Sequence, residues 1–161
     1  MKHLIVLIMI ALFVPYKAAA QFNTDRLMVS GRSALYYEDY VLSIQYFNQV
    51  LTAKPYLYEP WFFRGLAKYY LDDYSGAESD ISHAISLNPY IANMYELRGL
   101  CRIRQNSYAD AIGDYDHSLC LNPLNQAAWY NRALCRVEQK DYAQAQLDLD
   151  TIVVKWKQFA S

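Results

Sequence analysis

The sequence has little of what most catalytic and metal sites require. Its 161 residues include only three histidines and three cysteines. A G-x-S-x-G nucleophile motif, a phosphate-binding glycine loop and a Cys-x-x-Cys pair are all missing. His83 and His117 lie about one repeat apart, too far for a shared metal, and no cluster of cysteines or carboxylates at ligand spacing accompanies either, so we interpret them as surface histidines. We therefore expect no metal, no cofactor and no enzymatic activity.

An excess of basic residues is also missing. The net charge is −1, and removal of Lys2 and Lys17 with the N-terminal segment would lower it to −3. Phosphate backbones and anionic lipid surfaces attract strongly basic proteins. The charge balance thus argues against nucleic acid and membrane-surface partners.

Residues 1–20 have the pattern of a secretory signal peptide. A short cationic start is followed by an apolar run over residues 4–14 and by small residues at 18–20. An uncleaved membrane anchor is the alternative, but eleven apolar residues span only about half of a ~30 Å hydrocarbon core. No later stretch is apolar enough to cross a bilayer. We expect export to the periplasm or the exterior, with residues 21–161 as the mature domain and no stable membrane insertion.

The odd number of cysteines leaves at least one thiol unpaired in a monomer. Cys101 and Cys135 are 34 residues apart, and we interpret both as small buried residues. A disulfide between Cys120 and Cys135 stays an open alternative.

What the sequence does have is an internal repeat of 34 residues. The offset links prolines, tyrosines, large aromatic residues and small residues along the chain. Three of these series are Pro55, Pro89 and Pro123; Tyr40, Tyr74, Tyr108 and Tyr142; and Gly31, Gly65, Gly99 and Ala133. Four series in one register exclude coincidence, the fourth being Leu27, Trp61, Tyr95 and Trp129.

Each repeat is predicted to be an antiparallel pair of helices. Two periodic segments of about a dozen residues flank a polar break such as Asp72-Asp73, and a proline follows the second segment. Small residues such as Gly65 and Ala77 lie twelve apart across the break, where two helix backbones can approach most closely. One such pair buries little surface, so the pairs must stack.

These features resemble the tetratricopeptide repeat family. The resemblance is strong in the second, third and fourth repeats and weaker in the first. It implies an all-α fold, a right-handed α-solenoid of four helix-turn-helix repeats that ends in a long C-terminal helix. The expected repeats cover residues 24–57, 58–91, 92–125 and 126–159.

In that family the first helix of each repeat lines a concave groove that holds a protein or peptide. Carried over to this sequence, the groove would present Met28, Arg32, Phe62, Tyr69, Tyr70, Glu96, Arg104 and Tyr130, with Glu138 beside them. For Leu35, Ile103 and Val137, packing between repeats is the favoured alternative. Family members that grip acidic chaperone tails use lysines and asparagines at sites that hold Met28, Arg32 and Phe63 here. The resemblance therefore does not imply an acidic tail as the ligand.

A pair of opposite charges follows the repeats. An arginine directly precedes the small-residue site, and an aspartate follows that arginine by sixteen residues. The pairs are Arg64 and Asp80, Arg98 and Asp114, and Arg132 and Asp148. The first repeat has lost both, with Ser30 and Tyr46 in their places. We expect partly buried bidentate bridges that fix the register of the helices. Two independently solvated charges are the alternative.

The last helix carries an apolar stripe at residues 149, 152, 153 and 156. Trp156 and Phe159 offer a contact for a homodimer or a larger assembly. Three functions follow in order of preference: a protein-binding scaffold of the bacterial envelope, a structural or self-assembling subunit, and an enzyme.

Overall fold

The computed structural model describes the backbone of residues 23–159 and the side chains of residues 23–155. The described chain forms eight helices without a strand. The signal peptide predicted for residues 1–20 lies outside the described residues.

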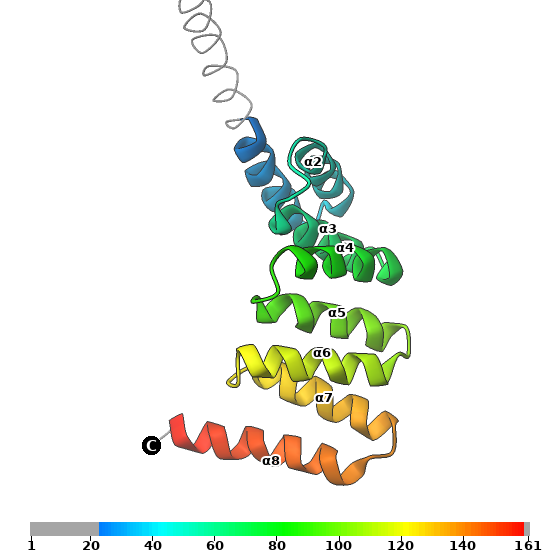
Figure 1. Cartoon of the computed structure of the whole chain (residues 1–161), viewed down its shortest axis with the longest axis vertical. Coiled ribbons are helices and arrows are strands. Elements are labelled where there is room, and N and C mark those ends of the chain that lie inside the picture. Colours follow the sequence, from blue (N-terminus) through cyan, green and yellow to red (C-terminus); the bar gives the residue numbers. More distant parts are fainter. Residues whose placement is uncertain (1–22, 160–161) are drawn as a thin grey trace, which may run out of the picture.

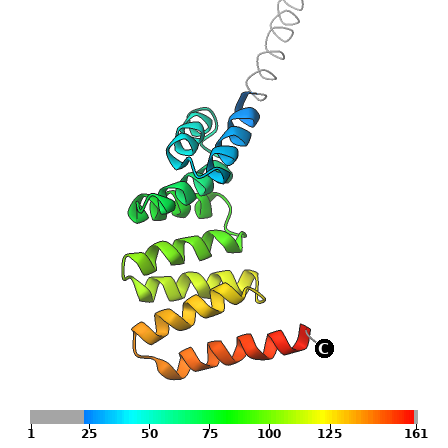
Figure 2. The same ribbon diagram turned by 180° about the vertical axis from the view of Figure 1, so that it is seen from behind.

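The helices follow one another in four antiparallel pairs, stacked along the long axis of the molecule (Figures 1 and 2). A helix over residues 23–36 pairs with α2 (Tyr40–Ala53), and α3 (Tyr58–Tyr70) pairs with α4 (Tyr74–Leu87). The third pair is α5 (Ala92–Arg104) with α6 (Tyr108–Leu121), and the fourth is α7 (Gln126–Glu138) with α8 (Tyr142–Phe159). The all-α repeat fold expected from the sequence is confirmed.

The turns inside the pairs share one backbone conformation. Glu38, Asp72, Asn106 and Lys140 all have φ between 60° and 64°, a left-handed conformation in which non-glycine residues are uncommon. The next residue is the N-cap of the following helix, and the side chains of Asp39 and Asp73 accept hydrogen bonds from the amides of Leu42 and Gly76. These acidic turn residues are thus helix caps.

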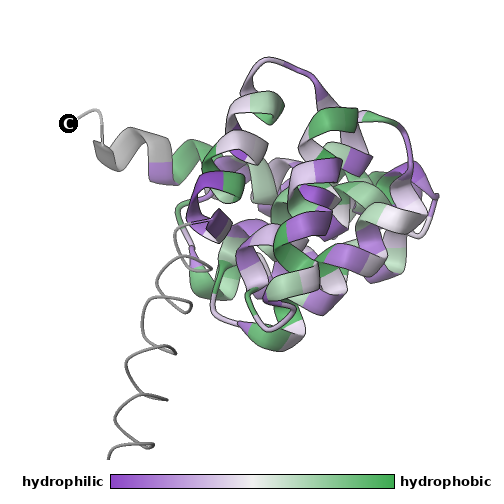
Figure 3. Ribbon diagram, turned by 90° about the horizontal axis from the view of Figure 1, so that it is seen from above, coloured by the Kyte–Doolittle hydropathy of each residue, from purple (hydrophilic) through white to green (hydrophobic). Residues whose placement is uncertain are grey.

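The helix backbones within a pair meet at the small residues. A Cβ added to Gly65 would lie 3.2 Å from the carbonyl oxygen of Ala77 and 2.8 Å from Cγ1 of Ile81. Ala77 and Ile81 are fully buried in a core that continues through Met94 and Cys101 of the next pair. The core therefore runs along the stack instead of filling one centre. Seen along the stack, hydrophobic and hydrophilic residues are interspersed around the helices (Figure 3).

Candidate functional site

The first helices of the pairs lie on the inner side of the stack. Helix α3 contacts α5, and α5 contacts α7, in addition to their contacts with the second helices. Among the described helices, by contrast, α4 does not contact α6 and α6 does not contact α8. The closer approach of the first helices defines the concave side, and we call the face they present the inner surface.

The larger side chains that sequence analysis assigned to this surface are partly to fully accessible. Tyr70 and Tyr130 are 53% and 52% exposed, while Phe62 and Tyr69 are half-buried. Leu134 adds a further apolar side chain, 43% exposed, that the sequence reading did not single out. Accessible aromatic and aliphatic groups on one concave face are the kind of surface at which peptides anchor.

Met28 is a correction to the sequence-based assignment. Its side chain is only 9% exposed, because it packs with Phe47 and Val50 in the core of the first helix pair. It therefore supports that pair and is not available to a ligand. Of the three residues for which packing was favoured, Leu35 and Ile103 are half-buried, whereas Val137 is 41% exposed.

Three charged residues of the inner surface, Glu96, Arg32 and Arg104, have partners within the chain. Glu96 accepts a hydrogen bond of 2.7 Å from the side-chain amide of Asn125, and the guanidinium of Arg32 lies 5.9 Å from the ring centre of Phe63. Arg104 reaches across to the preceding pair, where its Cζ lies 4.9 Å from the ring centre of Tyr74. The inner surface thus combines apolar and aromatic side chains with charged ones, and Glu96 occupies the repeat position of Phe62 and Tyr130.

Behind this surface, a ladder of ion pairs holds the repeats in register. Each repeat arginine forms a bidentate bridge to the aspartate sixteen residues later, and these aspartate side chains are only 2–4% exposed. The Nη2 to carboxylate distances are 2.7, 2.7 and 2.6 Å for Arg64, Arg98 and Arg132. Because the carboxylates are buried, these are not independently solvated charges.

Sequence analysis missed two further members of this ladder. Each aspartate also receives a second cation from one turn further along the first helix: Lys68, Arg102 or Arg136, at 2.7–2.9 Å. Each repeat arginine also donates its Nη1 to the preceding repeat, to Asn48, Ser82 or Asp116. Both sets recur at the 34-residue period, so the periodicity of polar residues could have identified them.

A second accessible surface lies at the turns of the first two pairs. Tyr36 and Tyr37 are 81% and 76% exposed, with ring centres 5.2 Å apart. Tyr40 stacks on Tyr70 of the next pair with ring centres 4.9 Å apart. Together with Glu38, which lies between them in the chain, we call these residues the tyrosine edge.

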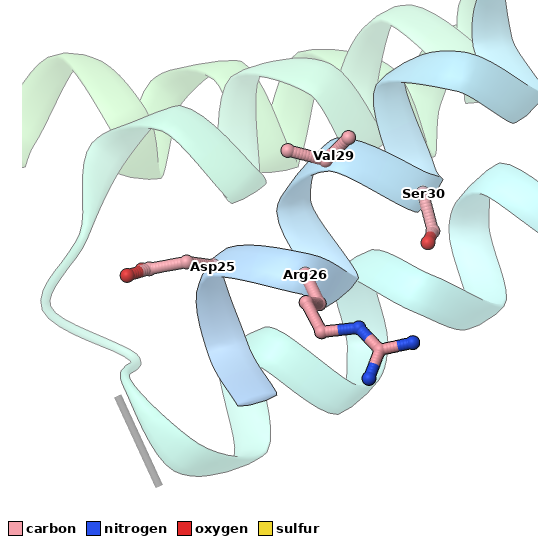
Figure 4. Close-up of a pocket in the computed structure, with 4 residues that line it drawn as sticks. All are labelled: Asp25, Arg26, Val29 and Ser30. Atoms are coloured by element: carbon pink, nitrogen blue, oxygen red, sulfur yellow. The ribbon is translucent and has the colours of Figure 1, made fainter. Parts of the chain in front are cut away.

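Two shallow hollows flank the first helix. One of about 300 Å³ is lined by Asp25, Arg26, Val29 and Ser30 (Figure 4). A neighbouring hollow of about 420 Å³ adjoins the tyrosine edge at Tyr37 and Asp39 and is lined on its apolar side by Ala34 and Leu42.

Helix α8 exposes several apolar side chains among its polar ones. Val153 is 52% exposed, although its equivalents Leu51, Ile85 and Leu119 are 7%, 9% and 6% exposed. Trp156 and Phe159, for which an oligomer contact was predicted, lie outside the residues whose side chains are described.

His83 and His117 are exposed at the surface and contact aromatic rings of their own repeats. His83 lies against Trp61 and His117 stacks on Tyr95, with ring centres 4.1 and 5.2 Å apart. All three cysteines are free thiols, with Cys101 and Cys135 buried and Cys120 exposed. Within the described residues no group of three potential metal ligands occurs, and no helix has the length and apolarity of a membrane span.

Comparison with known proteins identifies the repeat. The model of the tetratricopeptide repeat family matches residues 64–119 and 102–153. A crystal structure of MamA aligns with a TM-score of 0.84 at 19% identity, covering 90% of this chain and 86% of that one. The Arabidopsis OM64 TPR domain aligns at 0.72 and 19% identity, covering 74% and 98%.

A further similar structure contains a ligand. The first TPR of Spaghetti (RPAP3), bound to the HSP90 peptide SRMEEVD, aligns with a TM-score of 0.65 at 23% identity, covering 80% of this chain and 94% of that one. These likenesses concern the fold. No curated protein sequence matches the chain.

Proposed function

The chain belongs to the tetratricopeptide repeat family, whose fold is a scaffold for protein–protein interactions, and we propose that it binds another polypeptide along its inner surface without catalysing a reaction. The observation that carries this proposal is the accessible row of apolar side chains across α3 and α7. Tyr130 and Leu134 of α7, 52% and 43% exposed, belong to it together with the half-buried Phe62 of α3.

The composition of this face favours an amphipathic segment over an acidic tail. The acidic peptide SRMEEVD is bound by the RPAP3 domain. Here, the first two inner positions expected of an acidic-tail clamp hold the buried Met28 and a single arginine, Arg32, and Glu96 and Glu138 add negative charge to the same side. The tyrosine and leucine side chains would desolvate an apolar side chain of the partner, and tyrosine is among the residues that contribute most to the binding free energy at such surfaces.

The site of action is part of the proposal. The cationic start, apolar run and small residues of residues 1–20 support export from a bacterial cell to the periplasm or the exterior. Fractionation of cells that express the full chain, with N-terminal sequencing of the product, tests this. A mature protein in the cytosol with Met1 retained would contradict export.

Partner capture with paired variants tests the binding surface. Phe62→Ala combined with Tyr130→Ala removes two accessible rings from the inner surface, and we expect capture of an envelope partner to fall at least tenfold. The matched control combines Tyr90→Ala with Leu121→Ala, which removes side chains of 78% and 40% exposure away from that surface. Equal capture by both double variants would overturn the assignment, and unchanged melting temperatures would exclude unfolding as the cause.

Self-association through α8 is the second candidate. The exposure of Val153, at a position that is buried in the three preceding pairs, favours it. Light scattering of the full chain and of Val153→Glu distinguishes the cases: a dimer that the substitution converts to a monomer supports self-association, whereas a monomer in both argues against it.

A further inference from the structure

Tyr74 and Asp72, at the turn between α3 and α4, bind the side chain of Arg104. Arg104 of α5 lies over the ring of Tyr74, donates a hydrogen bond of 2.5 Å to its hydroxyl, and lies 3.7 Å from the carboxylate of Asp72. Tyr74 in turn donates to Asp72. A tyrosine ring and a turn carboxylate thus form a guanidinium site between the second and third pairs.

One repeat earlier, the ring and the carboxylate are present but the arginine is not. Subtracting the 34-residue period converts Asp72 to Glu38, Tyr74 to Tyr40, and Arg104 to Tyr70. Glu38 and Asp72 have φ values of 63° and 61°, so their side chains leave equivalent turns in the same direction. Glu38 makes no ion pair with any described residue, whereas Asp72 does.

The surroundings of Glu38 fit a cation. The exposed rings of Tyr36 and Tyr37 directly precede Glu38 in the chain, and the ring of Tyr70 stacks on that of Tyr40. Desolvation and the charge of Glu38 raise the pKa of Tyr40. No lysine or arginine occurs between Arg32 and Lys54 in the sequence, so the negative charge of this turn has no local cationic neighbour along the chain.

We propose that the tyrosine edge is a second binding surface that takes an arginine side chain from another polypeptide, with Glu38 as the carboxylate and exposed tyrosine rings as the stacking surface. Arginine fits better than lysine because its planar guanidinium stacks on aromatic rings and can donate to a carboxylate at the same time. The hollow beside Tyr37 and Asp39, with its apolar wall of Ala34 and Leu42, accommodates an apolar neighbour of that arginine. This surface shares Tyr70 with the inner surface but does not include Phe62 or Tyr130.

The test uses a capped peptide of alternating arginine and proline, and the same peptide with citrulline in place of arginine. Citrulline keeps the shape of the side chain and removes its charge. Titration of the full chain, labelled with ¹⁵N at tyrosine, reports binding residue by residue. We expect the arginine peptide to shift the amide signals of Tyr36, Tyr37 and Tyr40, and the citrulline peptide to leave them unmoved.

Variants then identify the groups involved. Glu38→Gln and Tyr37→Ala should each weaken binding about two- to fivefold, as expected for exposed charge pairs and cation–π contacts. Tyr142→Ala is the matched control, because Tyr142 is 63% exposed at the position equivalent to Tyr40 but follows a turn with Lys140 in place of Glu38. Arg104→Ala should free the equivalent site at Asp72, so that the peptide also shifts the Tyr74 signal.

Three results would overturn the inference. Equal binding of the citrulline peptide would show a merely apolar surface, and an unchanged affinity of Glu38→Gln would exclude the carboxylate. A peptide that leaves the tyrosine-edge signals unmoved but shifts Tyr130 would bind the inner surface instead. That last outcome would remove this inference and leave the proposed function standing, since the two surfaces have separate reporters.

Discussion

Arg98 and Asp114 form a bidentate bridge between α5 and α6, with Nη2 of the arginine 2.7 Å from Oδ1 of the aspartate. Arg102 lies 2.9 Å from the other carboxylate oxygen, so one buried aspartate holds two cations. Because Arg98 also donates to Ser82 and Arg102 to Glu78, both in α4, the same carboxylate ties two successive helix pairs together. This explains why the charged residues recur in register with the repeat.

Replacing Asp114 should therefore be costly. Asp114→Ala leaves two partly buried guanidinium groups without their shared carboxylate, and we expect a loss of about 3–5 kcal/mol in the free energy of unfolding. Asp150→Ala, at an exposed site on α8, should cost less than about 1 kcal/mol. Chemical denaturation measures both. A double-mutant cycle with Arg98→Ala that shows no coupling would contradict the account.

Two helical glycines should respond in opposite directions to alanine. A Cβ on Gly99 would lie 2.9 Å from Cζ of the buried Tyr115, and we expect Gly99→Ala to destabilise the chain by about 1–3 kcal/mol. Gly113, on α6, has nothing within 4 Å of an added Cβ, so Gly113→Ala should stabilise by about 0.5–1 kcal/mol. Equal effects in thermal unfolding would refute the close approach at Gly99.

Only one thiol should react in the folded protein. Burial raises the pKa of Cys101 to about 12 and that of Cys135 to about 11, whereas Cys120 is exposed. Mass spectrometry after brief alkylation should show one modified cysteine in native buffer and three in concentrated guanidinium chloride. Rapid native labelling of Cys101 would be inconsistent with the stacked core.

The ion pair between Glu78 and Arg102 should make stability depend on acidic pH. Burial tends to raise the pKa of Glu78, but hydrogen bonds from Arg102 and Gln105 outweigh it, so the pKa lies below its ordinary value. A carboxyl with a depressed pKa stabilises the fold above its unfolded pKa of roughly 4.3, and this contribution is lost as pH falls through the folded pKa. Glu78→Gln should therefore show a flatter decline of stability between about pH 5 and 3 than the wild type. Parallel curves from urea denaturation would exclude this contribution.

The 34-residue period was sufficient to predict the helix pairs, because it reports directly which residues repeat the same packing. The small size of Gly65 and Ala77 marks the close approach of two helices. The polar break in each repeat, such as Asp72-Asp73, marks where the first helix of the pair ends. The sequence could not reveal that Met28 is buried, because its position within the repeat is the same as that of the accessible Tyr130. Met28 is buried because its side chain packs against Phe47 and Val50, and the space that these neighbours leave cannot be read from the repeat pattern.

The tyrosine edge was likewise beyond sequence analysis. Tyr36, Tyr37 and Tyr40 are separated by Glu38 in the chain, and the stacking of Tyr40 on Tyr70 joins two repeats. The repeat alignment places Tyr70 and Arg104 at equivalent positions. Only the structure shows that a guanidinium at this position stacks on the tyrosine ring of the turn, as Arg104 does on Tyr74. Once the contacts of one repeat are known, a residue that differs in another repeat can be interpreted by the contact that it gains or loses.

Site-specific photo-crosslinking tests most directly whether the inner surface binds another polypeptide. A photoreactive amino acid is placed in the full chain at Phe62, Tyr130 or Leu134 on the inner surface, and at Ser86, Tyr90 or Leu121 elsewhere. The proposed function predicts one common partner band from the three inner positions and none from the other three. A partner that crosslinks equally well from both sets, or only from the second, would contradict the account.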